Sequence, residues 1–290
     1  ATCVIALCAG QYSVSVPEVI KILASRFVNV TKTWSNTAEG VVFTLRLPRM
    51  IGAVLVGSAL SLSGAAYQGV FKNPLVAPDL LGVSSGACVG ASVAILLHLN
   101  SFGVQAMAFV AGILAVGLTL FIPRLIKNTN MTMLVLSGII VKGIMDSVMG
   151  IIKYVADPET ELQSITYWQL GSLTKVLPRD LFTVGPVIIA ASVIIFLLRW
   201  RINILSLGDR EAKTLGVSVT VVRNFIIICA TLLTASAVCI SGTIGWIGLV
   251  IPHFARMLTG PDNTKAIPAS ILIGAIFMVA IDTLARALTS

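Results

Sequence analysis

One stretch of the sequence matches a catalytic motif, but the partners that the motif needs are missing. Residues 82–86 read GVSSG, the GxSxG pattern of serine hydrolases, with Ser84 as nucleophile. That chemistry requires a strand-to-helix turn, a histidine and an acid. The sequence has only two histidines, His98 and His253, and the motif opens an apolar stretch. Helix packing is the better interpretation, because three glycines recur every four residues and would line one face: Gly82, Gly86 and Gly90.

No pattern for metal chemistry or nucleotide hydrolysis is present. The cysteines form no CxxC or Cys/His ligand set and lie in apolar runs, as small buried hydrophobic residues do: Cys3, Cys8, Cys88, Cys229 and Cys239. No GxxxxGK[ST] phosphate loop occurs in the sequence. We therefore expect no enzyme activity, no cofactor and no metal site, and an ATP-driven process would need a separate ATPase subunit.

Lys142 and Asp146 are the charged residues whose position is hardest to explain by packing. They are four residues apart inside an otherwise apolar stretch. Charges in such stretches are costly and usually face a partner or a water-filled cavity. Two interpretations remain open. The two side chains could neutralise each other as an i,i+4 pair, or they could line a pathway.

The composition predicts an all-α, polytopic helical membrane protein. The 290 residues are 57% hydrophobic and 11% charged, and mean hydropathy is +0.98. Soluble domains carry about 25% charged residues. The apolar runs are long and continuous, which disfavours a β-barrel with its alternating ten-residue strands. The net charge of +8 is better explained by basic residues at membrane boundaries than by nucleic-acid binding.

The apolar runs predict nine spans, two of them incomplete or short, joined by polar connections. The predicted spans are 1–10 (partial), 48–70, 82–98, 103–125, 131–154, 180–200, 219–240, 244–258 (short) and 266–288. The polar connections are 11–42, 155–179 and 201–218, and Pro17 could open a short surface helix in the first. We expect one membrane domain over 1–290, with both ends cut from a longer protein.

Several motifs, in this order, are similar to those of the FecCD-type permease family. They are RLPR at 46–49, NPLVAPDLLGVS at 73–84, YWQLGSL at 167–173, SLGDREAKTLGV at 206–217 and the block around PHFAR at 252–256. This family comprises the membrane subunits of ABC importers for iron-siderophores, haem, vitamin B12 and related metal chelates or oxyanions such as molybdate. The sequence departs from the pattern at Trp246, Asn263 and Lys142, where the family usually has Phe, His and a small or neutral polar residue.

The resemblance implies the assembly. Each subunit would have about ten spans, and two subunits would form a homodimer in the lipid of a bacterial or archaeal inner (plasma) membrane. Two copies of a cytoplasmic P-loop ATPase and one periplasmic or lipid-anchored substrate-binding protein would complete a type II importer. Basic residues divide almost evenly between the two sides, so the positive-inside rule decides little. The cluster between Arg199 and Arg223 favours the inside.

The resemblance also assigns residues. ATPase coupling would fall to Leu207, Gly208, Asp209, Arg210, Glu211, Ala212, Lys213, Leu215 and Gly216, as a helix, a glycine turn and a second helix. The cytoplasmic gate would comprise Asn73, Pro74, Leu75, Met131 and Thr132. Docking of the binding protein would use Arg46, Arg49 and Arg286. His253 and Arg256 share a helix face and would make a structural contact near the ATPase.

A self-contained secondary transporter or channel is the alternative. It would need internal repeats and broken helices that bind a coupling ion near the midplane. The sequence shows no clear duplication, and Lys142 with Asp146 is the only candidate ion site.

Overall fold

The computed structural model describes residues 2–10, 12, 14–26, 28, 31–127 and 130–288, and no strand occurs in these ranges. The all-α prediction is therefore confirmed. The elements are α1 (Thr2–Cys8), α2 (Val16–Ala24), α3 (Asn36–Gly40), the π-helix η1 (Val41–Arg46), α4 (Leu47–Phe71), the 3₁₀-helix η2 (Pro78–Leu81), α5 (Val83–Leu96), α6 (Ser101–Leu125), α7 (Met131–Val155), α8 (Glu161–Leu170), α9 (Pro178–Leu207), α10 (Asp209–Thr214), α11 (Val219–Ser241), α12 (Ile247–Thr259) and α13 (Asn263–Leu288).

Among the described residues, six helices are long and apolar enough to cross a membrane: Asn36–Phe71, Ser101–Leu125, Met131–Val155, Pro178–Leu207, Val219–Ser241 and Asn263–Leu288. Helices α5 and α12 have 14 and 13 residues. At 1.5 Å per residue they reach about 20 Å, short of a hydrocarbon core of roughly 30 Å. They therefore need neighbouring segments to complete their passage.

The boundaries follow the predicted spans closely, with three differences. The helical run that includes α4 begins at Asn36, inside the predicted connection 11–42. Helix α9 continues past Arg199 and Arg201 to Leu207, into the predicted polar connection. Helix α8 lies within the predicted connection 155–179. The expected surface helix at Pro17 is confirmed as α2, which begins at Val16.

Helices α4 and α11 form the centre of the bundle. Their most apolar windows are 72% and 78% buried, against 28% for α7, α9 and α13. Hydroxyl groups join the two central helices: Ser63 Oγ lies 2.7 Å from Thr234 Oγ1, and Tyr67 OH lies 3.0 Å from Thr231 Oγ1. Both pairs satisfy polar groups that no water would reach.

Small residues allow α5 and α6 to pack closely. The predicted packing face is confirmed at Gly86 and Gly90, where an added Cβ would strike Ala111 on α6. Gly82 differs, since it has a φ of 80° and caps the start of α5. Its left-handed backbone favours glycine because a side chain there would be strained.

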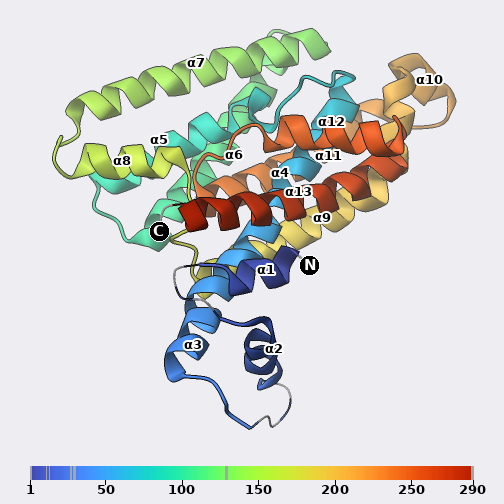
Figure 1. The fold of residues 1–290 in the computed structure, drawn as a ribbon. Coiled ribbons are helices and arrows are strands. Elements are labelled where there is room, and N and C mark those ends of the chain that lie inside the picture. The colour runs from blue at the N-terminus through green and yellow to red at the C-terminus, as the bar shows by residue number, and fades with distance from the viewer. Residues whose placement is uncertain are drawn as a thin grey trace.

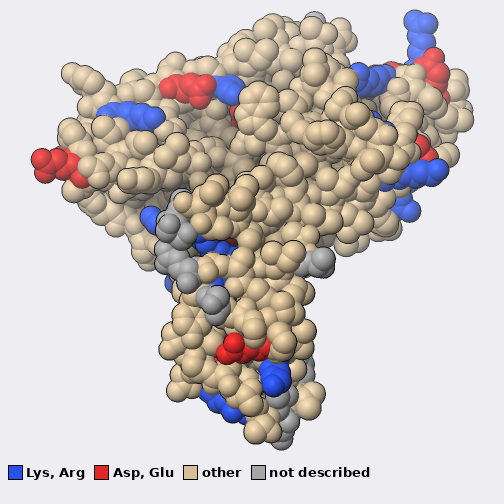
Figure 2. Space-filling view, viewed as in Figure 1, with Lys and Arg blue, Asp and Glu red and all other residues tan. Residues whose placement is uncertain are grey.

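The elements separate into two ends and a lobe. Helix α10 lies at one end of the bundle, and α8 and the C-terminal end of α13 lie at the other (Figure 1). Helices α2 and α3 project from the body as a lobe. Charged side chains gather around α10 and on this lobe, and much of the visible face between them is uncharged (Figure 2).

Candidate functional site

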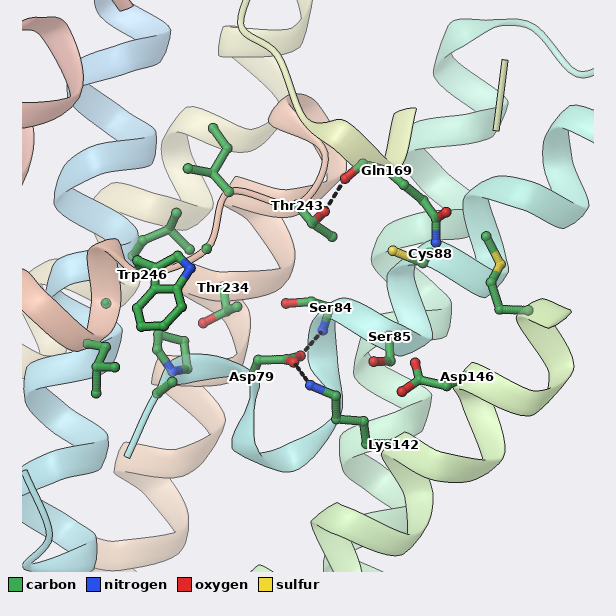
Figure 3. A pocket seen from close by; sticks show the side chains of 18 residues that line it. Asp79, Ser84, Ser85, Cys88, Lys142, Asp146, Gln169, Thr234, Thr243 and Trp246 are labelled. Carbon is green, nitrogen blue, oxygen red and sulfur yellow. Dashed lines mark hydrogen bonds and ion pairs between the residues drawn. The ribbon is translucent and has the colours of Figure 1, made fainter. Parts of the chain in front are cut away.

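A cavity of about 400 Å³ opens between α5, α7, η2 and the segment that enters α12. Its lining includes two carboxylates, one lysine, two serines and an aromatic ring: Asp79, Asp146, Lys142, Ser84, Ser85 and Trp246. These residues converge from helices on opposite sides of the cavity (Figure 3). Trp246 is 78% exposed and has a φ of 68°, so the chain holds a large ring at the rim in a rare backbone conformation.

Lys142 forms its salt bridge with Asp79, at 2.6 Å between Nζ and Oδ2. The backbone N–H of Ser84 donates to the other carboxylate oxygen of Asp79 at 3.1 Å (Figure 3). Asp79 thus does two things at once: it caps the first turn of α5 and it neutralises the charge of Lys142. The interpretation of Lys142 and Asp146 as a pair that neutralises itself is wrong, because the carboxylate fixed at the start of α5 holds the lysine. Both residues do line the same cavity.

The predicted gate turn follows α4 directly. Lys72 ends α4 with a φ of 52°, and the backbone N–H of Leu75 donates to Asn73 Oδ1 at 2.9 Å. Leu75 is 78% exposed, so the turn presents an apolar side chain outward. Met131 and Thr132 begin α7, where Met131 packs against the core and Thr132 is exposed.

Gln68 supports this turn and was missed at the sequence level. It is buried in α4, and its Nε2 donates to the carbonyls of Val76 and Leu249, both at 3.2 Å. Its Oε1 accepts from Arg256 Nη2 of α12. Arg256 therefore connects α12 to α4. A lone glutamine in an apolar run carries no local signal of these partners.

The predicted helix–turn–helix is present between α9 and α11. Leu207 ends α9, Gly208 has a φ of 145°, and α10 is followed by a turn in which Gly216 has a φ of 76°. Ala212 is the fully buried residue of α10. The other predicted coupling side chains on this helix and just after it are exposed: Asp209, Arg210, Glu211, Lys213 and Leu215.

Asp209 has two cationic neighbours. Its Oδ1 lies 2.7 Å from Arg223 Nη2 on α11 and 3.4 Å from Lys72 Nζ. The hydrogen bond from Arg223 lowers the pKa of Asp209 below its ordinary value, and the charge of Lys72 adds to this effect. The carboxylate is therefore ionised at neutral pH.

The three arginines predicted to dock a binding protein lie in different settings. Arg46 is 4% exposed and donates to the carbonyls of Leu7 and Cys8 at 2.7 and 3.1 Å, at the end of α1. Its guanidinium is enclosed, which contradicts the expectation of an exposed docking group. Arg286 Nη2 donates to the carbonyl of Ala6 at 2.5 Å.

Arg49 pairs with Asp282 of α13, with Nε 3.0 and 2.9 Å from the two carboxylate oxygens. Their side chains are 17% and 10% exposed. This pair joins α4 to α13 beside a second cavity of about 510 Å³, which is also lined by Leu170, Trp246 and Phe277. The partner of Arg49 lies 233 positions away, so sequence spacing could not identify it.

Comparison with known proteins assigns the family. The model of the FecCD transport family matches residues 1–290. The chain belongs to the FecCD transport family. It is 36% identical over 289 residues to the molybdate import system permease protein MolB of Haemophilus influenzae, covering 99% of this chain and 85% of that protein. It is 35% identical over 277 residues to the hemin transport system permease protein HmuU of Yersinia pestis, covering 92% and 82%.

A solved structure of a metal-chelate type ABC transporter in an inward-facing conformation has the same fold, with a TM-score of 0.88 at 34% identity, covering 99% of this chain and 87% of that one. The protein is thus a permease subunit of a type II ABC importer. It is a multi-pass protein of the prokaryotic plasma membrane and not itself an ATPase. A permease of this type works with an ATPase and a binding protein.

Proposed function

We propose that two copies of this permease enclose a central pathway, and that the uncovered face of α7 lines it. One observation carries the proposal. Lys142 and Asp146 are exposed on α7, a helix long and apolar enough to span the membrane. An ionised side chain at the centre of a lipid-facing helix costs about 2.5–3.5 kcal/mol on insertion scales. The face that carries two such residues therefore meets water or protein.

Further residues of α7 support the same orientation. An added Cβ would meet nothing within 4 Å at Gly143 or at Gly150, and Ser147 is exposed between them. Glycines of a membrane helix usually serve close packing. Because nothing in a single copy packs on these two, a second copy across the pathway is the neighbour that we propose.

The rest of the machinery occupies the two ends of the bundle. We assign ATPase docking to α10 and its glycine turn, and the cytoplasmic gate to 73–75 with Met131 and Thr132. Two ATPase copies would bind the homodimer on this side. Arg49 and Arg286 would face one binding protein on the other side. The cargo would be a metal chelate or an oxyanion, the range that the relatives' names cover.

Thiol labelling tests the pathway. Single cysteines at Gly143 and Ser147 would be compared with single cysteines at Val193 and Leu197, exposed apolar positions of α9. The background would have all five native cysteines changed to Ser or Ala, including Cys88, which lines the cavity. A charged, membrane-impermeant methanethiosulfonate should label the α7 positions in at least one nucleotide state and leave the α9 positions unlabelled. Equal labelling of both helices, or none on α7 in every state, would contradict the proposal.

A further inference from the structure

Lys72 occupies a backbone position that usually belongs to glycine. It ends α4 in the left-handed conformation, with φ 52° and ψ 34°. Glycine is the common residue at such helix ends, because a Cβ is disfavoured there. Lys127 adopts the same conformation after α6, with φ 55°, so the backbone alone assigns Lys72 no role and its side-chain contact is what distinguishes it.

The side chain of Lys72 reaches the first residue of α10. Its Nζ lies 3.4 Å from Asp209 Oδ1, and the same oxygen accepts from Arg223 Nη2 at 2.7 Å. The Arg223 side chain is only 15% exposed, so it forms a fixed anchor on α11. Asp209 therefore joins the end of α4, the start of α10 and the first turns of α11.

Both ends of this contact adjoin parts with a proposed role. Lys72 immediately precedes the gate turn at 73–75, and Asp209 begins the element assigned to ATPase docking. We propose that Lys72 and Asp209 are positioning residues that transmit movement of α10 to the gate turn. This inference rests on the roles proposed for those two segments.

The strength of the contact suits a transmitting role better than a structural one. The side chains of Lys72 and Asp209 are 36% and 50% exposed. Exposed ion pairs contribute little to folding stability. Loss of this pair should therefore leave the fold intact and change how transport follows ATP hydrolysis.

Lys72→Gly separates the two roles. It keeps the backbone conformation and removes only the side chain, so the melting temperature should stay the same or rise. Lys127→Gly is the matched control, because Lys127 follows α6 with a φ of 55° and forms no ion pair within the described residues. The companion variant is Asp209→Asn.

The assay uses the complete importer in proteoliposomes with molybdate and hemin as the cargoes tried, and measures the cargo transported per ATP hydrolysed. Lys72→Gly and Asp209→Asn should each lower this ratio about two- to fivefold, as expected for loss of one exposed pair. The double variant should be no worse than Asp209→Asn alone, because Lys72 has no ion pair left to lose once Asp209 is neutral. An unchanged ratio, additive losses, or an equal loss with Lys127→Gly would overturn the inference.

A second readout separates failure of the inference from failure of the proposed function. Leu75→Cys should crosslink across the homodimer in some nucleotide states when Lys72 and Asp209 are intact. If this crosslinking never depends on nucleotide, the proposed gate itself is wrong. If it depends on nucleotide and does so identically in Lys72→Gly and Asp209→Asn, the gate stands and the transmitting contact is overturned.

Discussion

The crossing of α4 and the start of α12 should be intolerant of a single added methyl group. Gly64 of α4 faces Gly248, and a Cβ on Gly64 would lie 2.6 Å from the carbonyl carbon of Gly248 and 2.8 Å from its Cα. Ordinary contacts of a Cβ fall between 3.4 and 4 Å. The carbonyl oxygen of Gly248 would lie nearer still. Gly64→Ala therefore requires the two helices to separate by at least about 1.5 Å.

Little around this crossing can move to make room. The atoms that would obstruct a Cβ on Gly64 belong to the backbone of Gly248. A Cβ on Gly248 itself would lie 2.5 Å from Pro78 Cδ and 2.8 Å from the carbonyl oxygen of Leu60. Overpacking costs about 1–3 kcal/mol, and rigid backbone places this site at the upper end. Alanine recovers up to about 1 kcal/mol of helix propensity. The net loss should be about 2 kcal/mol, or roughly 4–8 °C in melting temperature for a chain of this size.

The assay is thermal unfolding of the detergent-solubilised protein, followed by tryptophan fluorescence. Gly117→Ala is the matched control, since Gly117 lies inside α6 and a Cβ there would meet nothing within 4 Å. That variant should be neutral or slightly stabilising. If Gly64→Ala melts at or above the temperature of Gly117→Ala, the close approach of the two helices is refuted.

Three further predictions concern the ends of the bundle. Asp282→Asn should lower the free energy of unfolding by about 2 kcal/mol, because it leaves Arg49 uncompensated in a mostly buried site. The double variant with Arg49→Gln should recover part of that loss in thermal unfolding, and strictly additive losses would contradict the pairing. Gly216→Trp should strain a left-handed turn and lower the cargo transported per ATP without reducing the amount of protein in the membrane; unchanged transport would contradict the coupling role. Because the pKa of Asp209 is lowered, its ion pairs should contribute fully above its ordinary value of 3.8 and disappear only as pH falls through the still lower folded value. The transport ratio should thus lose nothing through Asp209 between pH 7 and 5, and an Asp209-dependent loss in that window, absent from Asp209→Asn, would contradict this ionisation.

Apolar runs made most of the long helices predictable, because a run of about 20 apolar residues has few alternatives in a membrane. The extension of α9 was not predictable in this way. Arg199 and Arg201 interrupt the apolar pattern, yet the backbone continues to Leu207. Helix α8 was not predicted because its sequence mixes Glu161 and other polar residues with the apolar ones and shows no clear apolar face.

The contacts of the candidate site could not all be predicted, mainly because interacting residues lie far apart in the sequence. The i,i+4 spacing made Asp146 the nearest candidate for Lys142, but η2 brings Asp79 against α7. Likewise, Arg46 stands next to a predicted membrane boundary, where arginines are commonly exposed. In the fold, the end of α1 covers it and supplies its carbonyl acceptors. Tertiary contacts of this kind leave no periodic trace in the sequence.

The crossing at Gly64 also determines how α4 can tilt. Arg49 and Lys72 lie on this one helix, about 22 and 12 Å from Gly64 at 1.5 Å per residue. If the crossing acts as a fulcrum, α4 is a lever with unequal arms. A displacement of about 2 Å at Arg49 would then give about 1 Å at Lys72, in the opposite direction. With the roles proposed above, a binding protein near Arg49 and an ATPase coupled through Lys72 would act on opposite ends of the same helix, at unequal distances from the crossing.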